Sequence, residues 1–95
     1  MTIETTPFDV AEYLTEPEDQ LRLLEDAFAS GDEHIVAAAI GIVARARGMT
    51  ELADATGIKR QALYRALSDK GNPTLGTLLK VLPALGLRMC VMEAA

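Results

Sequence analysis

The chain has 95 residues, 49% of them hydrophobic, and a formal net charge of −5. This length fits one domain, and the apolar content excludes a disordered tail. Only 4% of the residues are aromatic and none is Trp, so the core must be aliphatic. Folding at this size buries about 60–68% of the unfolded surface, so oligomerisation would add useful stability. The longest apolar run, residues 35–44, is about half as long as a membrane span requires, and the N-terminal residues do not resemble a signal peptide.

The sequence contains few of the residues and motifs typical of catalytic or metal-binding sites. The single cysteine, Cys90, excludes an intramolecular disulfide and fits a cytoplasmic location. With one cysteine and one histidine, His34, the chain cannot assemble a zinc site of the usual type. The P-loop, G-x-S-x-G and H-E-x-x-H motifs are absent as well. We therefore expect a protein that is not an enzyme and holds no cofactor or metal, with His34 on the surface and Cys90 as a small apolar residue.

The net charge hides an uneven distribution along the chain. Residues 1–43 carry ten acidic residues and one basic one, a net charge of −9. Residues 44–70 carry six basic and three acidic residues, a net charge of +3, and residues 71–95 add +1. Such asymmetry is a hint of a charged partner. The acidic run has two interpretations that the sequence leaves open, a solvated face or a surface that meets a basic partner.

The first half of the chain predicts three helices. Thr6-Pro7 is typical of a cap followed by proline in the first turn, and it predicts a short helix through Leu14. The segment Thr15–Glu18 matches a capping box for a second helix that ends at Gly31. The apolar residues expected on its inner stripe are Leu21, Leu24 and Phe28.

The third predicted helix is capped by Asp32 and ends at Gly48. Its interior is apolar on nearly all sides, so we expect it to be the central buried helix. Arg45 and Arg47 in its last turn complement the helix dipole.

The second half predicts three further helices and a strand. Thr50 would cap a helix over residues 51–56, a second helix follows from about 60 to 68, and Thr74 would cap the last one. The residues of the last helix expected to face inward are Leu75, Leu78, Leu79 and Leu82, and Pro83 should kink or end it. Residues 87–92 are typical of a short strand, whose partner strand could come from another chain.

These elements predict an all-α fold in a single domain, residues 1–95. It is a small helical bundle of the lambda-repressor-like type with a possible short C-terminal strand. Acidic helices would occupy residues 1–43, a helix-turn-helix core residues 44–86, and the strand or tail residues 87–95.

The stretch from residue 50 to 67, TELADATGIKRQALYRAL, has the spacing of a helix-turn-helix. Ala53 is small where two helices would cross, and Gly57 can adopt the positive φ of a tight turn. Leu63 lies six residues after the glycine. The apolar wedge that would set the crossing angle consists of Leu52, Ile58, Leu63 and Leu67.

The second helix of this motif exposes side chains suited to reading DNA. Arginine can bond guanine, glutamine can bond adenine, and tyrosine can reach a phosphate. A lysine at the start of the helix favours a phosphate. The candidate DNA-binding residues are Lys59, Arg60, Gln61, Tyr64 and Arg65, with Thr50 and Lys70 beside them. The alternative is that they form the solvated face of a small helical domain.

Several stretches together resemble the addiction-module antidote proteins, the HigA-like antitoxins with a Cro/cI-type helix-turn-helix. They are RARGMTELA from residue 45, TGI from 56, ALYRALS from 62, GNPTL from 71 and LKVLPALGLR from 79, with the acidic YLTEPEDQLRLLEDAFASGD from 13. Pro83 departs from the family pattern, and Lys59 replaces a more usual serine or threonine cap.

The resemblance implies a dimer that binds its own operator and neutralises a RelE/ParE-like toxin encoded beside it. The toxin would be held by the acidic N-terminal helices or by the C-terminal strand. The candidate toxin anchors in the N-terminal region are Phe8, Tyr13 and Leu14, and each could equally belong to the core. A prophage-type repressor without a toxin remains an alternative. So does a protein-interaction module whose helix-turn-helix no longer binds DNA.

Overall fold

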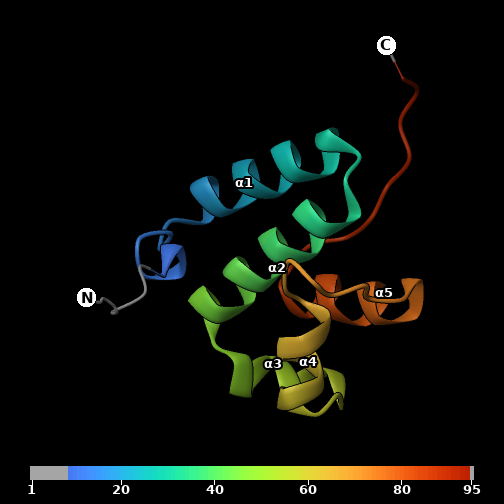
Figure 1. Ribbon diagram of the computed structural model, residues 1–95. Coiled ribbons are helices and arrows are strands. Elements are labelled where there is room, and N and C mark those ends of the chain that lie inside the picture. The colour runs from blue at the N-terminus through green and yellow to red at the C-terminus, as the bar shows by residue number, and fades with distance from the viewer. Residues whose placement is uncertain (1–8, 95) are drawn as a thin grey trace.

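The computed structural model describes residues 9–94, and all of the regular secondary structure in this range is helical (Figure 1). The elements in chain order are the 3-10 helix η1 (Val10–Glu12) and the α-helices α1 (Pro17–Ser30), α2 (Glu33–Arg47), α3 (Met49–Thr56), α4 (Arg60–Ala66) and α5 (Leu75–Ala84). This confirms the all-α prediction. Among these residues no helix is long and apolar enough to cross a membrane.

Helix α1 packs against α2 as an antiparallel hairpin. It ends at Gly31, in the left-handed conformation, as predicted, but its start and its inner face differ from the prediction. Its cap is Glu16, whose side chain makes no capping bond, so the predicted capping box does not form. The buried positions of α1 are Gln20, Leu24 and Ala27, whereas Leu21 and Phe28 are 46% and 42% exposed. The buried face of α1 is therefore shifted by one position from the predicted one: Gln20 and Ala27 are buried in place of Leu21 and Phe28.

The described N-terminal helix, η1, ends earlier than predicted. Asp9 caps η1 by accepting a hydrogen bond from the backbone N–H of Ala11 at 3.0 Å. The described helix ends at Glu12 rather than at Leu14. The proposed start at Thr6-Pro7 lies outside the described residues.

Helix α2 is the centre of the molecule, as predicted. Asp32 caps it by accepting hydrogen bonds from the N–H groups of His34 and Ile35. Ala37, Ile40, Val43 and Ala44 on this helix are fully buried. The last three join leucines of α1, α3 and α4 and the apolar end of α5 in one core. Gly41 lies where α2 meets the end of α4, and a Cβ there would overlap the carbonyl oxygen of Leu67. The close approach of the two backbones therefore requires glycine at this position.

Helices α3, α4 and α5 form the lower half of Figure 1. The cap of α3 is Gly48, with φ of 113°, and the helix starts at Met49, so Thr50 is inside the first turn and is not the cap that we predicted. Helix α4 ends at Ala66, two residues before the predicted end.

Helix α5 begins as predicted but buries a different face. Thr74 caps it by accepting from the N–H of Thr77 at 3.1 Å. Val81 and Leu82 are buried and Leu78 is half-buried, whereas Leu75 and Leu79 are 63% and 55% exposed. The leucine spacing alone could not show this, because Val81 and the following Leu85 occupy the core instead. Pro83 lies in the last turn and the helix ends one residue later, in line with the expected effect of proline.

The predicted C-terminal strand does not form within the described residues. Residues 87–94 have no regular secondary structure and leave the body as an extended segment (Figure 1). A strand needs a partner for its backbone groups, and the described chain offers none at this position. The β-forming composition of the segment is therefore not enough to make a strand in one copy of the protein.

Candidate nucleic-acid interface

Helices α3 and α4 are joined by a tight three-residue turn. Gly57 ends α3 with φ of 75°, and a Cβ there would have nothing within 4 Å, so the requirement for glycine comes from the backbone conformation alone. The Thr56 hydroxyl donates to the carbonyl of Leu52 at 2.8 Å and accepts from the N–H of Ile58 at 3.2 Å. These bonds fix the turn from both sides.

The inner residues of the two helices anchor the pair to the core. Leu52, Leu63 and Leu67 are buried, and Ile58 and Ala53 are partly buried against the same cluster. Because the inner face is held in this way, the outer face of α4 has a defined orientation.

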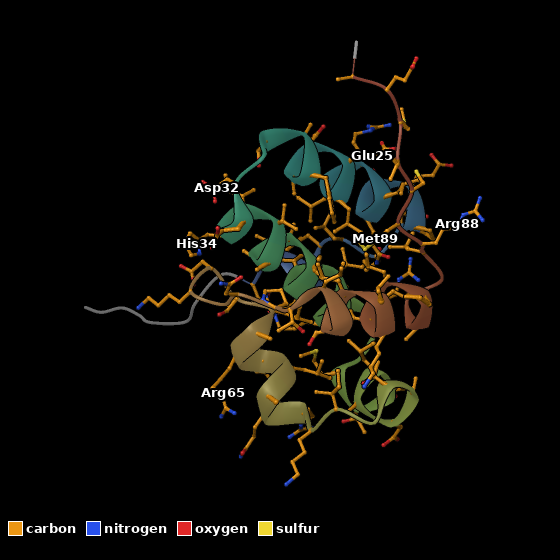
Figure 2. All side chains as sticks on the ribbon, turned by 90° about the vertical axis from the view of Figure 1, so that its right-hand side faces the viewer. Glu25, Asp32, His34, Arg65, Arg88 and Met89 are labelled. Carbon is orange, nitrogen blue, oxygen red and sulfur yellow. The ribbon has the colours of Figure 1, made fainter. Side chains whose placement is uncertain are left out.

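The outer face of α4 carries the residues that the sequence singled out. Lys59, Arg60, Gln61 and Arg65 are exposed, and the aromatic ring of Tyr64 is 44% exposed. Figure 2 shows Arg65 pointing away from the body of the protein. Residues 59–65 include three basic residues and no acidic one. A rigid helix face with this composition can donate several hydrogen bonds to phosphates or base edges.

One contact joins the two helices on this exposed side. A guanidinium nitrogen of Arg60 donates to the hydroxyl of Thr50 at 3.2 Å. Two of the candidate residues are thus brought together at the starts of α3 and α4. Lys70 is exposed in the turn after α4 and, within residues 9–94, forms no hydrogen bond or ion pair with the other candidates.

Two basic residues of the positively charged segment 44–70, Arg45 and Arg47, form contacts within the protein. Arg45 forms a bidentate salt bridge with Asp9, with N–O distances of 3.1 and 3.3 Å. Hydrogen bonds from Arg45 and from the N–H of Ala11 lower the pKa of the Asp9 carboxyl below its ordinary value of 3.8. The basic character of the candidate interface therefore rests on α4 and the following turn.

Arg47 belongs to a network that sequence reasoning missed. Its Nε donates to the side-chain oxygen of Gln20 at 2.8 Å, and its Nη1 donates to the carbonyl of Leu85 at 2.5 Å. Gln20 is 4% exposed and donates in turn to the carbonyl of Leu14 at 2.6 Å. The network ties α1, α2 and the end of α5 together. A glutamine within an otherwise apolar helical stripe was the signal that could have revealed it.

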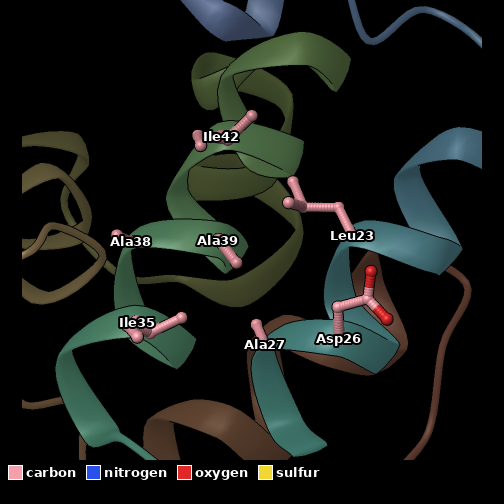
Figure 3. Close-up of a pocket in the computed structure, with 7 residues that line it drawn as sticks. All are labelled: Leu23, Asp26, Ala27, Ile35, Ala38, Ala39 and Ile42. Carbon is pink, nitrogen blue, oxygen red and sulfur yellow. The ribbon is translucent and has the colours of Figure 1, made fainter. Parts of the chain in front are cut away.

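The two candidate toxin anchors that the structure describes lie in the segment between η1 and α1. Tyr13 is 68% exposed, Leu14 is half-buried, and Phe8 lies outside the described residues. A groove of about 320 Å³ between α1 and α2 is almost wholly apolar (Figure 3). Its lining residues are Leu23, Asp26, Ala27, Ile35, Ala38, Ala39 and Ile42. Within it the Asp26 carboxylate is the only charged lining group, so the groove suits an apolar contact with an acidic edge.

Comparison with known proteins defines the class of this chain. A family model described as a probable addiction module antidote protein matches residues 4–93. The chain is also 40% identical over 94 residues to an uncharacterized protein of Haemophilus influenzae, covering 99% of this chain and 97% of that protein. No solved structure matches the chain significantly. The chain belongs to the family of probable addiction module antidote proteins.

Proposed function

We propose that this protein is the antitoxin of a type II toxin–antitoxin module that represses its own operon. In this proposal α3 and α4 are a helix-turn-helix, and a dimer binds operator DNA through Arg60, Gln61 and Tyr64, with phosphate contacts from Lys59 and Lys70. The observation that carries the DNA-binding part is the exposed face formed by α4 and its N-cap residue Lys59. Together they carry three basic residues and no acidic one, and a buried leucine anchors the helix. A dimer is included because one such helix reads too few base pairs for strong specificity.

A gel-shift titration with the DNA upstream of the gene tests this part. Arg60→Ala should weaken operator binding by about 1–3 kcal/mol and relax specificity at one base position. Arg22→Ala removes a positive charge of the same kind from an exposed position on α1 and serves as the matched control. Equal affinity of the Arg60 variant and the Arg22 variant would remove Arg60 from the DNA-binding set.

The antidote part of the proposal rests on family membership and on the acidic first half of the chain. We propose that a RelE/ParE-like toxin, with a basic surface, binds the acidic region of residues 1–43, with Tyr13 and Leu14 among its contacts. Opposite charges speed such an encounter and improve its specificity. Co-expression with the product of the neighbouring gene, followed by a growth test and a pull-down, would detect neutralisation.

A prophage-type repressor without a toxin is the second candidate, because the same α4 face would serve it equally. It predicts the salt-sensitive gel shift but no rescue of growth and no complex with a neighbouring gene product. A protein-interaction module predicts the reverse, a complex without any salt-sensitive gel shift.

A further inference from the structure

The C-terminal segment after α5 exposes apolar side chains that the rest of the described chain does not cover. Val91 is 99% exposed and Met92 is 81% exposed. By contrast Leu87 packs against the core, and its N–H donates to the carbonyl of Leu82 at 2.8 Å. Within the described chain, residues 88–94 form no backbone hydrogen bond. The segment therefore begins on the body of the protein and ends with open backbone groups, as an unpaired edge strand does.

Arg88 and Met89, at the start of this segment, point to opposite sides, as neighbouring residues of a strand do (Figure 2). Figure 2 shows Met89 on the side of the segment toward the helices and Arg88 on the other side. Met89 is 41% exposed and so is partly covered by the body. Alternation places Val91 on the same side as Met89, but beyond the surface that could cover it. Burial of Val91 therefore requires an apolar surface that another chain supplies.

We propose that residues 88–92 of two copies pair as antiparallel strands about a two-fold axis at Cys90. This inference rests on the dimer of the proposed function and specifies how that dimer is joined. The pairing would place Val91 of one copy opposite Met89 of the other, on the side facing the helices. The two Cys90 residues would lie opposite each other on the outer side, and Arg88 would lie opposite Met92 of the second copy.

The register of the pairing follows from two-fold symmetry and from the side chains. A two-fold axis through an antiparallel pair sets one residue opposite its own copy, so the candidate centres are Met89, Cys90 and Val91. A centre at Val91 would place the Glu93 carboxylate against Met89 on the inner side. A centre at Met89 would set Val91 opposite Leu87, whose N–H is already bonded to Leu82 and whose side chain packs against the core. Cys90 is the centre that keeps the inner side apolar and uses only open backbone.

Sedimentation of single-residue variants tests whether the segment joins the dimer. Val91→Asp should weaken the dimer at least about tenfold, because it loses an apolar cross-strand pair and buries a charge. Met92→Asp makes the same chemical change on the outer side and should weaken the dimer by less than about threefold. Both positions are exposed in the single chain, so circular dichroism should show unchanged helix in both variants. Equal dimer affinity of the two variants would overturn the proposal.

Disulfide cross-linking tests the register. Directly opposite residues have Cβ atoms about 4.5–5.5 Å apart, so mild oxidation with copper phenanthroline in air should link the wild-type chains through Cys90. The double variant Cys90→Ser, Met92→Cys moves the thiols about 14 Å apart and should cross-link at least about tenfold more slowly. Equal rates would overturn the register.

The two levels of the proposal fail in different ways. If the wild-type protein dimerises and the Val91→Asp variant dimerises with the same affinity, the strand pairing alone is overturned. A wild-type protein that is monomeric at all concentrations would overturn the dimer as well.

Discussion

Replacement of Gly41 by alanine should destabilise the protein, although alanine is the better helix former. In the middle of α2 the change favours the helix by up to about 1 kcal/mol. The added Cβ would overlap the backbone carbonyl oxygen of Leu67, which cannot rotate away as a side chain could. The end of α4 must then move, together with the fully buried Leu63 and Leu67. Overpacking of this kind costs about 1–3 kcal/mol, and contact with backbone favours the upper end, so we expect a net loss of about 2 kcal/mol.

Urea unfolding followed by circular dichroism measures this loss. Gly76→Ala is the matched control, because Gly76 is exposed near the start of α5 and its added Cβ would meet only the Thr74 hydroxyl, at 3.7 Å. That variant should be as stable as wild type or up to about 1 kcal/mol more stable. A Gly41→Ala protein at least as stable as wild type would refute the close packing of α2 against the end of α4.

Three other changes test separate contacts. Arg47→Ala removes the hydrogen bond to the buried Gln20 and should lower the free energy of unfolding by about 1–3 kcal/mol, whereas Arg22→Ala should leave it within about 0.5 kcal/mol. Asp32→Ala removes the cap of α2 and should cost about 1 kcal/mol in the same assay, and a loss below the error of measurement would contradict the capping role. Asp9→Asn keeps a capping oxygen but loses the charge paired with Arg45, so wild type should be the more stable by less than about 1 kcal/mol at neutral pH. Because pairing lowers the pKa of Asp9 in the folded state, this difference should hold above its ordinary value of 3.8 and vanish as the pH falls through the folded-state pKa. A difference that persists at pH 2 would have another origin.

Local chemistry made much of the fold and of the candidate site predictable. Asp32 and Thr74 cap their helices because a short side-chain oxygen reaches the open N–H groups of the first turn wherever it occurs. Gly57 ends α3 because the left-handed backbone there disfavours a side chain. The same local logic placed the basic and polar residues of α4 on one helix face, and they are exposed.

The sequence by itself therefore determined an all-helical chain, its central apolar helix α2 and the exposed face of α4. Only the tertiary structure decided that the inner stripe of α1 includes Gln20, because the partner that satisfies this amide, Arg47, lies far along the chain. It also decided that Leu75 and Leu79 are exposed, since spacing defines a helix face but not which neighbour covers it. The tail shows the same limit, because residues 87–92 favour a strand and yet form none without a second strand beside them. Helix ends and turns depend on neighbours in sequence, whereas burial and strand pairing depend on neighbours in space.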